Sequence, residues 1–163
     1  MPRGPRLDSP GTLHHVIVRG IKGKEIVKDN KDRKDFLTRI GDIALETDTA
    51  IYAWALMKNH AHILLRSGSW GLSTYMRRVL SGYAVSYNKR HRGYGHLFQN
   101  RYKSILCEED TYFKELVRHI HLNPLRAKLV SNLSQLERYA WCGYAVLMSR
   151  SKNKWQDKEY GLP

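Results

Sequence analysis

Residues 50–66 read AIYAWALMKNHAHILLR, two apolar runs separated by the polar pair Lys58–Asn59. The first run (50–57) and the second (60–66) each have the length and the apolar content of a buried strand. A connection this short favours antiparallel neighbours, because the chain must turn back at once. This expected hairpin decides the fold, since the other elements have to pack on it or pair beside it.

Strands and helices alternate on either side of the hairpin. Before it, LHHVIVRG (13–20) alternates as a strand does, and residues 32–47 place apolar side chains at helical spacing, with Asp32 as a possible N-cap. Pro124 ends the last helix, because proline cannot continue one. The elements expected after the hairpin are a helix over 72–91, a strand over 101–107 and a helix over 108–123.

This β-α-β-β-α-β-α order predicts an α+β fold with a ferredoxin-like, split βαβ core. We expect an antiparallel sheet with helices on one face, which leaves the other face open to a ligand or a partner. The length of 163 residues suits one compact domain. The expected organisation is an extended lead-in over 1–12, the domain over 13–148 and a solvated tail over 149–163.

Composition favours a polyanionic partner. Lys and Arg number 28 against 15 Asp and Glu, so the net charge is +13, which indicates nucleic acid first and an acidic membrane surface second. The isolated Cys107 and Cys142 form neither a disulfide framework nor a CxxC zinc site. The N-terminus has no apolar core of a signal peptide, and no apolar run has the roughly 18–20 residues of a membrane span. We therefore expect a cytoplasmic protein.

The second strand of the hairpin carries two histidines, His60 and His62. Residues two apart on a strand share a face, with Cα atoms roughly 6.5–7 Å apart, so both imidazoles can converge on one cation. The alternative is a strand with a histidine-rich face, because Leu64 shares their parity and makes that face mixed. Two ligands also leave a metal site incomplete.

The last expected helix offers further polar groups. His119 and Asn123 are four residues apart, so they share a helix face about 6 Å apart along the axis, and Asn123 can supply a carbonyl oxygen. The alternatives are a helix C-cap for Asn123 and a partly exposed surface histidine at position 119. His121 lies on another side of the helix and is expected to be a packing or surface residue.

NHAHILL (59–65), GHLFQNRYKS (95–104) and HIHLNPLRA (119–127) resemble, in this order, the HUH single-tyrosine transposases, most closely the REP-associated tyrosine transposases. The resemblance covers roughly residues 10–145. It implies a ferredoxin-like core in which His60 and His62 bind a divalent ion, Mg²⁺ or Mn²⁺, and Asn123 completes the coordination. It also implies that the metal polarises a scissile phosphate of single-stranded DNA, which a tyrosine of the last helix attacks.

The sequence departs from this family at the nucleophile, because His119 stands where the family has tyrosine. Three explanations compete: a relative that binds DNA without cutting it, an introduced substitution, or another tyrosine in its place. Tyr112 lies close to the same helix face but about 10 Å away along the axis, and Tyr102 lies on the preceding strand. Such an offset is large for catalysis, because a misplacement of about 1 Å can already lower the rate strongly.

Basic residues interleaved with aromatics are typical of a surface that binds single strands. The competing functions are metal-dependent cleavage and transfer of structured single-stranded or hairpin DNA, hairpin binding without cleavage, and RNA binding on a ferredoxin-like sheet. The RNA function is disfavoured because the aromatic RNA-stacking segment of such sheets is missing. The family resemblance allows a monomer or a homodimer. The expected DNA contacts are Arg19, Lys22, Lys24, Arg77, Arg78, Lys89, Arg90, Arg101, Tyr102 and Lys103.

Overall fold

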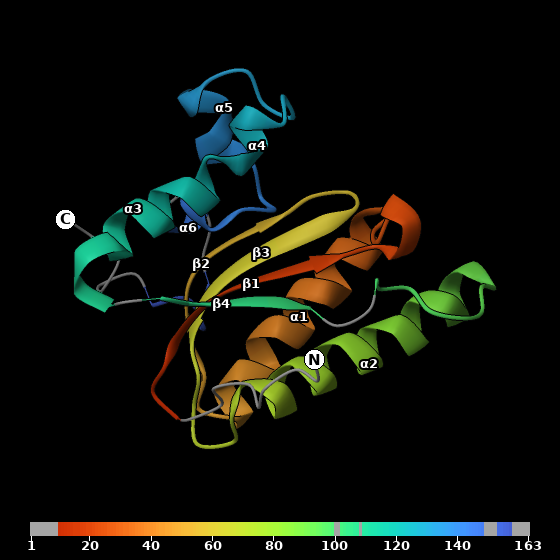
Figure 1. Cartoon of the computed structure of the whole chain (residues 1–163). Coiled ribbons are helices and arrows are strands. Elements are labelled where there is room, and N and C mark those ends of the chain that lie inside the picture. The colour runs from red at the N-terminus through yellow and green to blue at the C-terminus, as the bar shows by residue number, and fades with distance from the viewer. Residues whose placement is uncertain (1–9, 100–101, 108, 149–152, 158–163) are drawn as a thin grey trace.

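A computed structural model describes residues 10–99, 102–107, 109–148 and 153–157. Its sheet has four antiparallel strands in the order β2-β3-β1-β4 (Figure 1). The Met57 amide donates to the His60 carbonyl at 2.9 Å and closes the tight turn expected between the two central runs. The α+β class and the antiparallel sheet are therefore confirmed. The strands are β1 (Leu13–Arg19), β2 (Ala50–Leu56), β3 (His60–Arg66) and β4 (Lys103–Cys107).

The helices follow the strands in the expected succession, with short additional ones. None of the described helices is long and apolar enough to cross a membrane. The three long helices are α1 (Asn30–Glu46), α2 (Leu72–His91) and α3 (Glu109–His121). The short ones are the 3₁₀ turn η1 (Ile21–Gly23), α4 (Asn123–Arg126), α5 (Leu133–Arg138) and α6 (Gly143–Leu147).

One face of the sheet is covered by α1 and α2, which lie side by side beneath it (Figure 1). Phe36 of α1 and Tyr83 of α2 meet edge to face, with ring centroids 4.9 Å apart, over the buried valines of β1. The Tyr75 hydroxyl donates to the Ile40 carbonyl at 2.8 Å and so satisfies a polar group inside this core. The apolar spacing of both helices therefore predicts their buried faces correctly.

The expectation of helices on one face only is wrong, because α3 packs on the second face (Figure 1). Phe113, Val117 and Ile120 form a buried stripe on α3 and contact a second core that includes Tyr52 and Leu64. A helix with such a stripe has to bury it, and the exposed side of the sheet is the apolar surface available. The second face therefore stays accessible only beside α3.

The start of α1 also differs from the expectation, because the N-cap is Asp29 and not Asp32. The Asp29 carboxylate accepts a hydrogen bond from the Asp32 amide at 2.9 Å. Asp32 is fully buried, and its own carboxylate accepts from the Lys28 amide at 2.8 Å. A buried carboxylate needs partners of this kind, which periodicity alone does not reveal.

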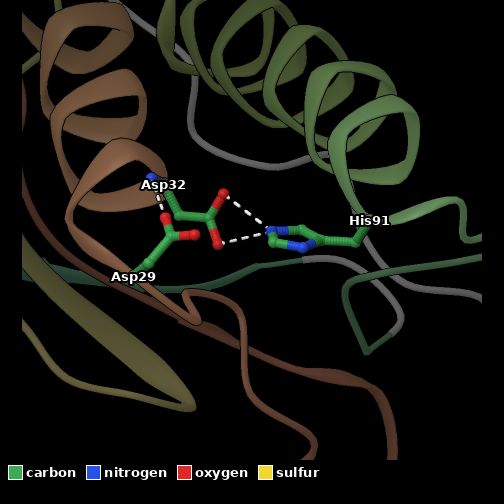
Figure 2. Close-up of side chains that lie close together, drawn as sticks. All are labelled: Asp29, Asp32 and His91. Atoms are coloured by element: carbon green, nitrogen blue, oxygen red, sulfur yellow. Dashed lines mark hydrogen bonds and ion pairs between the residues drawn. The ribbon is translucent and has the colours of Figure 1, made fainter.

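Two side chains at the end of α2 meet this buried carboxylate. Arg90 and His91 approach Asp32 to 2.8 and 2.7 Å, as Figure 2 shows for the histidine. Burial alone raises the pKa of Asp32, but the hydrogen bonds from Lys28, His91 and Arg90 outweigh burial and hold that pKa below its ordinary value. Arg90 also reaches Asp35 at 2.8 Å. This ion-pair group fastens the start of α1 to the end of α2.

Pro124 does not end the helical region as expected. It is the second residue of α4, which follows α3 after the single linking residue Leu122. Leu122 donates to the Arg118 carbonyl at 2.9 Å and accepts from the Arg126 amide at 3.0 Å, so the helical path nearly continues. Proline is tolerated there because the first turn of a helix needs no donor from it.

Residues 153–157 do not belong to a solvated tail. Gln156 is buried, and its side-chain oxygen accepts a hydrogen bond from the Trp54 indole at 2.8 Å. Trp155 packs over Gly41 of α1, where a Cβ atom would lie 2.1 Å from the indole ring. The polar composition hides this docking, because Gln156 and Trp54 are 102 residues apart in the sequence.

The outer edge of β2 is paired with later parts of the chain. Asp157 donates to the Ile51 carbonyl at 2.7 Å, and Leu56 donates to the Trp141 carbonyl at 2.8 Å. Isolated bridges join the same strand to residues 142 and 156. Backbone groups of an edge strand that would otherwise face solvent are thus satisfied within the chain.

His121 is buried beneath the same region and is 1% exposed. Neither of its ring nitrogens has a hydrogen-bond partner among the described residues. Its Nε2 atom lies 2.6 Å from the place of a Cβ at Gly143, so only glycine fits there without a shift. Burial lowers the pKa of His121 to about 3, which keeps the ring neutral at physiological pH.

The ion-pair group predicts a stability effect for Asp32→Asn. Removing one partner of a buried ion pair leaves the other charges uncompensated, so we expect the free energy of unfolding at pH 7 to fall by about 3 kcal/mol. Because the folded pKa of Asp32 is lowered, its contribution is present above the ordinary pKa of 3.8 and is lost as the pH falls further. Urea unfolding at several pH values measures this difference.

The matched control is Asp42→Asn, which removes the same charge from an exposed position of α1. Its expected effect is within about 0.5 kcal/mol. Equal losses for both variants would contradict the structural role of Asp32.

Candidate functional site

The two histidines of β3 lie on the sheet face that α3 partly covers. Their rings meet edge to face, with centroids 5.0 Å apart. His62 is 8% exposed, whereas His60 at the start of the strand is half-buried. The Nδ1 atom of His60 donates to the Asn59 side-chain oxygen at 2.8 Å, which orients that ring. The same-face geometry predicted from the spacing is therefore present.

A third histidine, His15 of β1, joins this pair. Its Nε2 atom and the Nδ1 atom of His62 share a hydrogen bond of 3.1 Å, and the ring centroids are 5.3 Å apart. Sequence reasoning missed this residue, although the strand pattern LHHVIVRG contained the signal. His15 and Ile17 point to the same face of β1, and Ile17 lies opposite His62 in the β1–β3 register. His15 therefore lies on the sheet face that carries His62.

His119 reaches the same group from α3. Its ring lies edge to face with that of His15 at a centroid distance of 6.4 Å. The side chain is exposed, and its backbone carbonyl accepts from the Arg126 guanidinium of α4. His15, His60, His62 and His119, the histidine cluster, thus gather from two strands and one helix.

The environment of the histidine cluster lowers the pKa of its members and so favours their neutral forms. Burial, followed by the proximity of His60 and His15, lowers the pKa of His62 to about 3. Burial, His119 and Lys103 lower the pKa of His15 to about 4. The pKa of His119 is lowered by burial and by Arg126. Neutral imidazoles keep the lone pairs that metal coordination and nucleophilic attack both need.

Asn123 occupies the first position of α4 and is not a C-cap of α3. Its side-chain nitrogen is buried and has no hydrogen-bond partner among the described residues. Its backbone carbonyl accepts from the Ala127 amide at 2.8 Å. A buried amide with an unused donor is uncommon, and a ligand that orients the side chain is one explanation for it.

A second group of side chains also has the spacing of a metal site. Asp29, Asp32 and His91 offer ligand atoms within 4.8 Å of one another, the one such set of His, Cys, Asp or Glu within the described ranges (Figure 2). However, Asp32 already accepts from Lys28, Arg90 and His91. A metal ion would have to compete there with the Arg90 guanidinium for the Asp32 carboxylate, so we assign this group to the polar contacts between α1 and α2.

Two of the expected DNA-contacting residues border the histidine cluster. Arg19 is exposed and lies opposite His60 in the β1–β3 register. Burial is the largest cause of the lowered pKa of His60, and the charge of Arg19 lowers that pKa further. Lys103 is exposed on β4, opposite Ile17. Both cations therefore lie where a phosphate at the cluster can reach them.

The other expected contacts are distributed over the molecule. Arg90 is held by Asp32 and Asp35, and Arg78 pairs with Glu46 of α1, so neither cation is free. Tyr102 packs half-buried against the first core. Lys22, Lys24, Arg77 and Lys89 are exposed. Arg101 and the side chain of Tyr112 lie outside the described residues.

The fold and the histidine pair facing a helix define an HUH-type transposase core. Residues 10–123, more than half of the chain, match the family model described as IS200-like transposase, and the chain belongs to that family. The resemblance found from the three sequence motifs is thereby confirmed. No curated protein matches the chain.

Solved structures with the same fold are distant in sequence. A REP-associated tyrosine transposase bound to a REP hairpin has a TM-score of 0.73 at 13% identity and covers 100% of this chain and 98% of its own. A putative transposase from Deinococcus radiodurans R1 has a TM-score of 0.50 at 14% identity and covers 73% of this chain and 94% of its own. The tRNA(His) guanylyltransferase of Saccharomyces cerevisiae has a TM-score of 0.51 at 10% identity and covers 99% of this chain and 82% of its own.

The buried neutral histidines predict a loss of stability on acidification. The pKa values of His15, His62 and His121 lie near 4, 3 and 3 in the folded state against 6.5 ordinarily. Between about pH 4 and 6.5 the unfolded chain therefore binds more protons, and the free energy of unfolding rises with pH. Urea unfolding across this range measures the slope.

His121→Leu isolates one of these residues. We expect the slope between pH 4.5 and 6 to fall by about 1.4 kcal/mol per pH unit, because one titrating group is removed. An unchanged slope, or an NMR titration of His121 near pH 6.5, would show that the ring is not buried as described.

Proposed function

We propose that this protein binds structured single-stranded DNA and carries out metal-dependent strand cleavage and transfer, with His119 in the position of the usual tyrosine. The observation that carries the proposal is the convergence of His119 with His15, His60 and His62 on one sheet face. A nucleophile beside a metal site with two histidine ligands, bordered by two exposed cations, is the set of groups that this reaction needs.

The residues present fit a divalent cation. The Nδ1 atoms of His60 and His62 are engaged by Asn59 and His15, so their Nε2 atoms remain as ligands, and the Asn123 oxygen is the third donor proposed. A bound Mg²⁺ or Mn²⁺ supplies Lewis-acid polarisation of the scissile phosphate. His15 acts as a positioning residue, because a hydrogen bond to the second nitrogen of a ligating histidine fixes its tautomer and orientation.

His119 supplies the nucleophilic nitrogen. Its lowered pKa favours the neutral imidazole, in which a ring lone pair attacks phosphorus while the P–O3′ bond breaks. The imidazole N–H proton is transferred to the departing 3′ oxygen, which leaves a 5′-phosphohistidine and a free 3′-hydroxyl. Arg19 and Lys103 hold the negative phosphate oxygens during this step.

The second candidate is a relative that binds DNA hairpins without cleaving them. The histidine at position 119 itself favours it, because an imidazole has a shorter reach than a phenol. The DNA partner is supported by the net charge of +13 and by the fold shared with a transposase that is bound to a DNA hairpin. Both candidates require the same DNA surface and differ only in the chemistry at position 119.

His15→Phe tests the proposed metal site at His60 and His62. The variant keeps a ring on the sheet face but loses the hydrogen bond to His62, so we expect Mn²⁺ affinity to fall by about 10- to 100-fold. Isothermal titration with Mn²⁺ measures this, and His62→Ala should abolish binding. His14→Phe is the matched control, because His14 bonds to Ser104 and Thr12 instead. Equal affinities for wild type and His15→Phe would remove His15 from the site.

Covalent capture tests the nucleophile. A labelled DNA hairpin with unpaired flanks, incubated with the protein and Mn²⁺, should give an adduct that survives denaturation and alkali but is lost in acid, as a phosphoramidate is. His119→Ala should give none, and His119→Tyr should give an acid-stable adduct. Gel electrophoresis after each treatment provides the measurement.

Tyr112→Phe is the control for the substitute tyrosine and should leave the adduct unchanged. An adduct that persists in His119→Ala and disappears in Tyr112→Phe would reassign the nucleophile. Tight binding without any adduct would establish the non-cleaving candidate.

A further inference from the structure

A cavity of about 420 Å³ opens between η1, the segment that follows it and the C-terminal end of α2. This volume lies in the range of roughly 300–1,000 Å³ that small ligands occupy. None of the histidine cluster lines it, so it is a separate site. Its lining residues are Ile21, Lys24, Glu25, Lys28, Tyr87, Asn88, Tyr94, His96 and Leu97.

The walls of this cavity are fixed by backbone and side-chain hydrogen bonds. Ile21 donates to the Leu97 carbonyl at 2.9 Å and joins η1 to the loop after α2. The Asn88 side chain donates to the Gly95 carbonyl at 3.1 Å, which holds the loop tip around Tyr94 in place. Gly95 adopts a φ of +82°, a conformation that a side chain rarely allows. The cavity is therefore preformed.

Its chemistry combines positive charge with aromatic surface. Its lining includes two lysines, Lys24 and Lys28, and one acid, Glu25, and the Lys28 ammonium lies 5.8 Å from the ring centre of Tyr87. Tyr87 is almost buried, whereas Tyr94 at the rim is 95% exposed. A cavity lined by an exposed aromatic ring and two lysines suits a base that stacks and a phosphate that pairs with the ammonium groups.

The cavity and the histidine cluster lie at the same end of the sheet. Gly20, next to Arg19 of β1, donates to the Asn59 carbonyl at 2.9 Å, immediately before His60. Ile26, just after Glu25, donates to the Lys58 carbonyl at 2.7 Å. The segment that lines the cavity is thus hydrogen-bonded to the turn that precedes His60.

We infer that this cavity binds one unpaired nucleotide of the DNA strand next to the cleaved phosphate, with the base stacked on Tyr94 and the phosphate held by Lys24 and Lys28. The inference rests on the proposed function, which brings single-stranded DNA to the histidine cluster. It adds a second, non-catalytic contact that sets which phosphate of the strand lies over His60 and His62. The spacing between the bound base and the histidine cluster then determines which phosphate is cleaved.

The test uses the full chain and a DNA hairpin with oligothymidine flanks, in which each flank thymidine is replaced in turn by photoreactive 5-iodouracil. We expect one position to cross-link, and mass spectrometry to locate the link in the peptide that contains Tyr94. An abasic residue at that position should weaken binding by about tenfold, as loss of a stacked base does. In Tyr94→Ala the same abasic residue should have no further effect.

Trp70→Ala is the matched control, because Trp70 is an exposed aromatic residue that does not line the cavity. It should keep the abasic effect of the wild type. Cross-links outside residues 87–97, or the same abasic profile in Tyr94→Ala as in wild type, would overturn the inference while hairpin binding stands. Failure of the wild type to bind the hairpin at all would overturn the proposed function and the inference with it.

Discussion

The pairing of β1 with β3 is the constraint on which the rest of the structure depends. Ile17 lies opposite His62 and Arg19 opposite His60, so His15 comes within hydrogen-bonding distance of His62. A shift of one residue would turn every side chain of β1 to the other face. His15 would leave the cluster and enter the apolar core beneath the sheet. One register therefore determines the packing on one face and the arrangement of the histidine cluster on the other.

The second constraint is that α3 both covers the sheet and presents position 119. Ile120 is fully buried in the second core, and the adjacent His119 points away from it into solvent beside the cluster. The helix cannot slide to bury Ile120 differently without moving His119. Hydrophobic packing of α3 thus sets where the imidazole at position 119 lies relative to the sheet.

The parts of the fold that depend on local periodicity could be predicted from the sequence. The helix over 72–91 and the strand over 60–66 have the observed bounds, because their buried faces repeat along one element. The docking of α3, the burial of Asp32 against Arg90 and the packing of Gln156 depend on residues far apart in the chain. The candidate site likewise has a part that local sequence predicts and a part that depends on distant residues. The His60–His62 pair follows from one strand, whereas His15 joins it only through pairing between strands.

The pairing along the outer side of β2 has a consequence for self-association. An unpaired edge strand is a template on which a second chain can add a strand, and proteins block such edges to avoid aggregation. Here the hydrogen bonds from Asp157 and to Trp141 occupy that edge. Among the described strands, β4 is the outer strand on the opposite side of the sheet. A second copy that added a strand at β2 would have to displace these hydrogen bonds, whereas they place no such obstacle at β4.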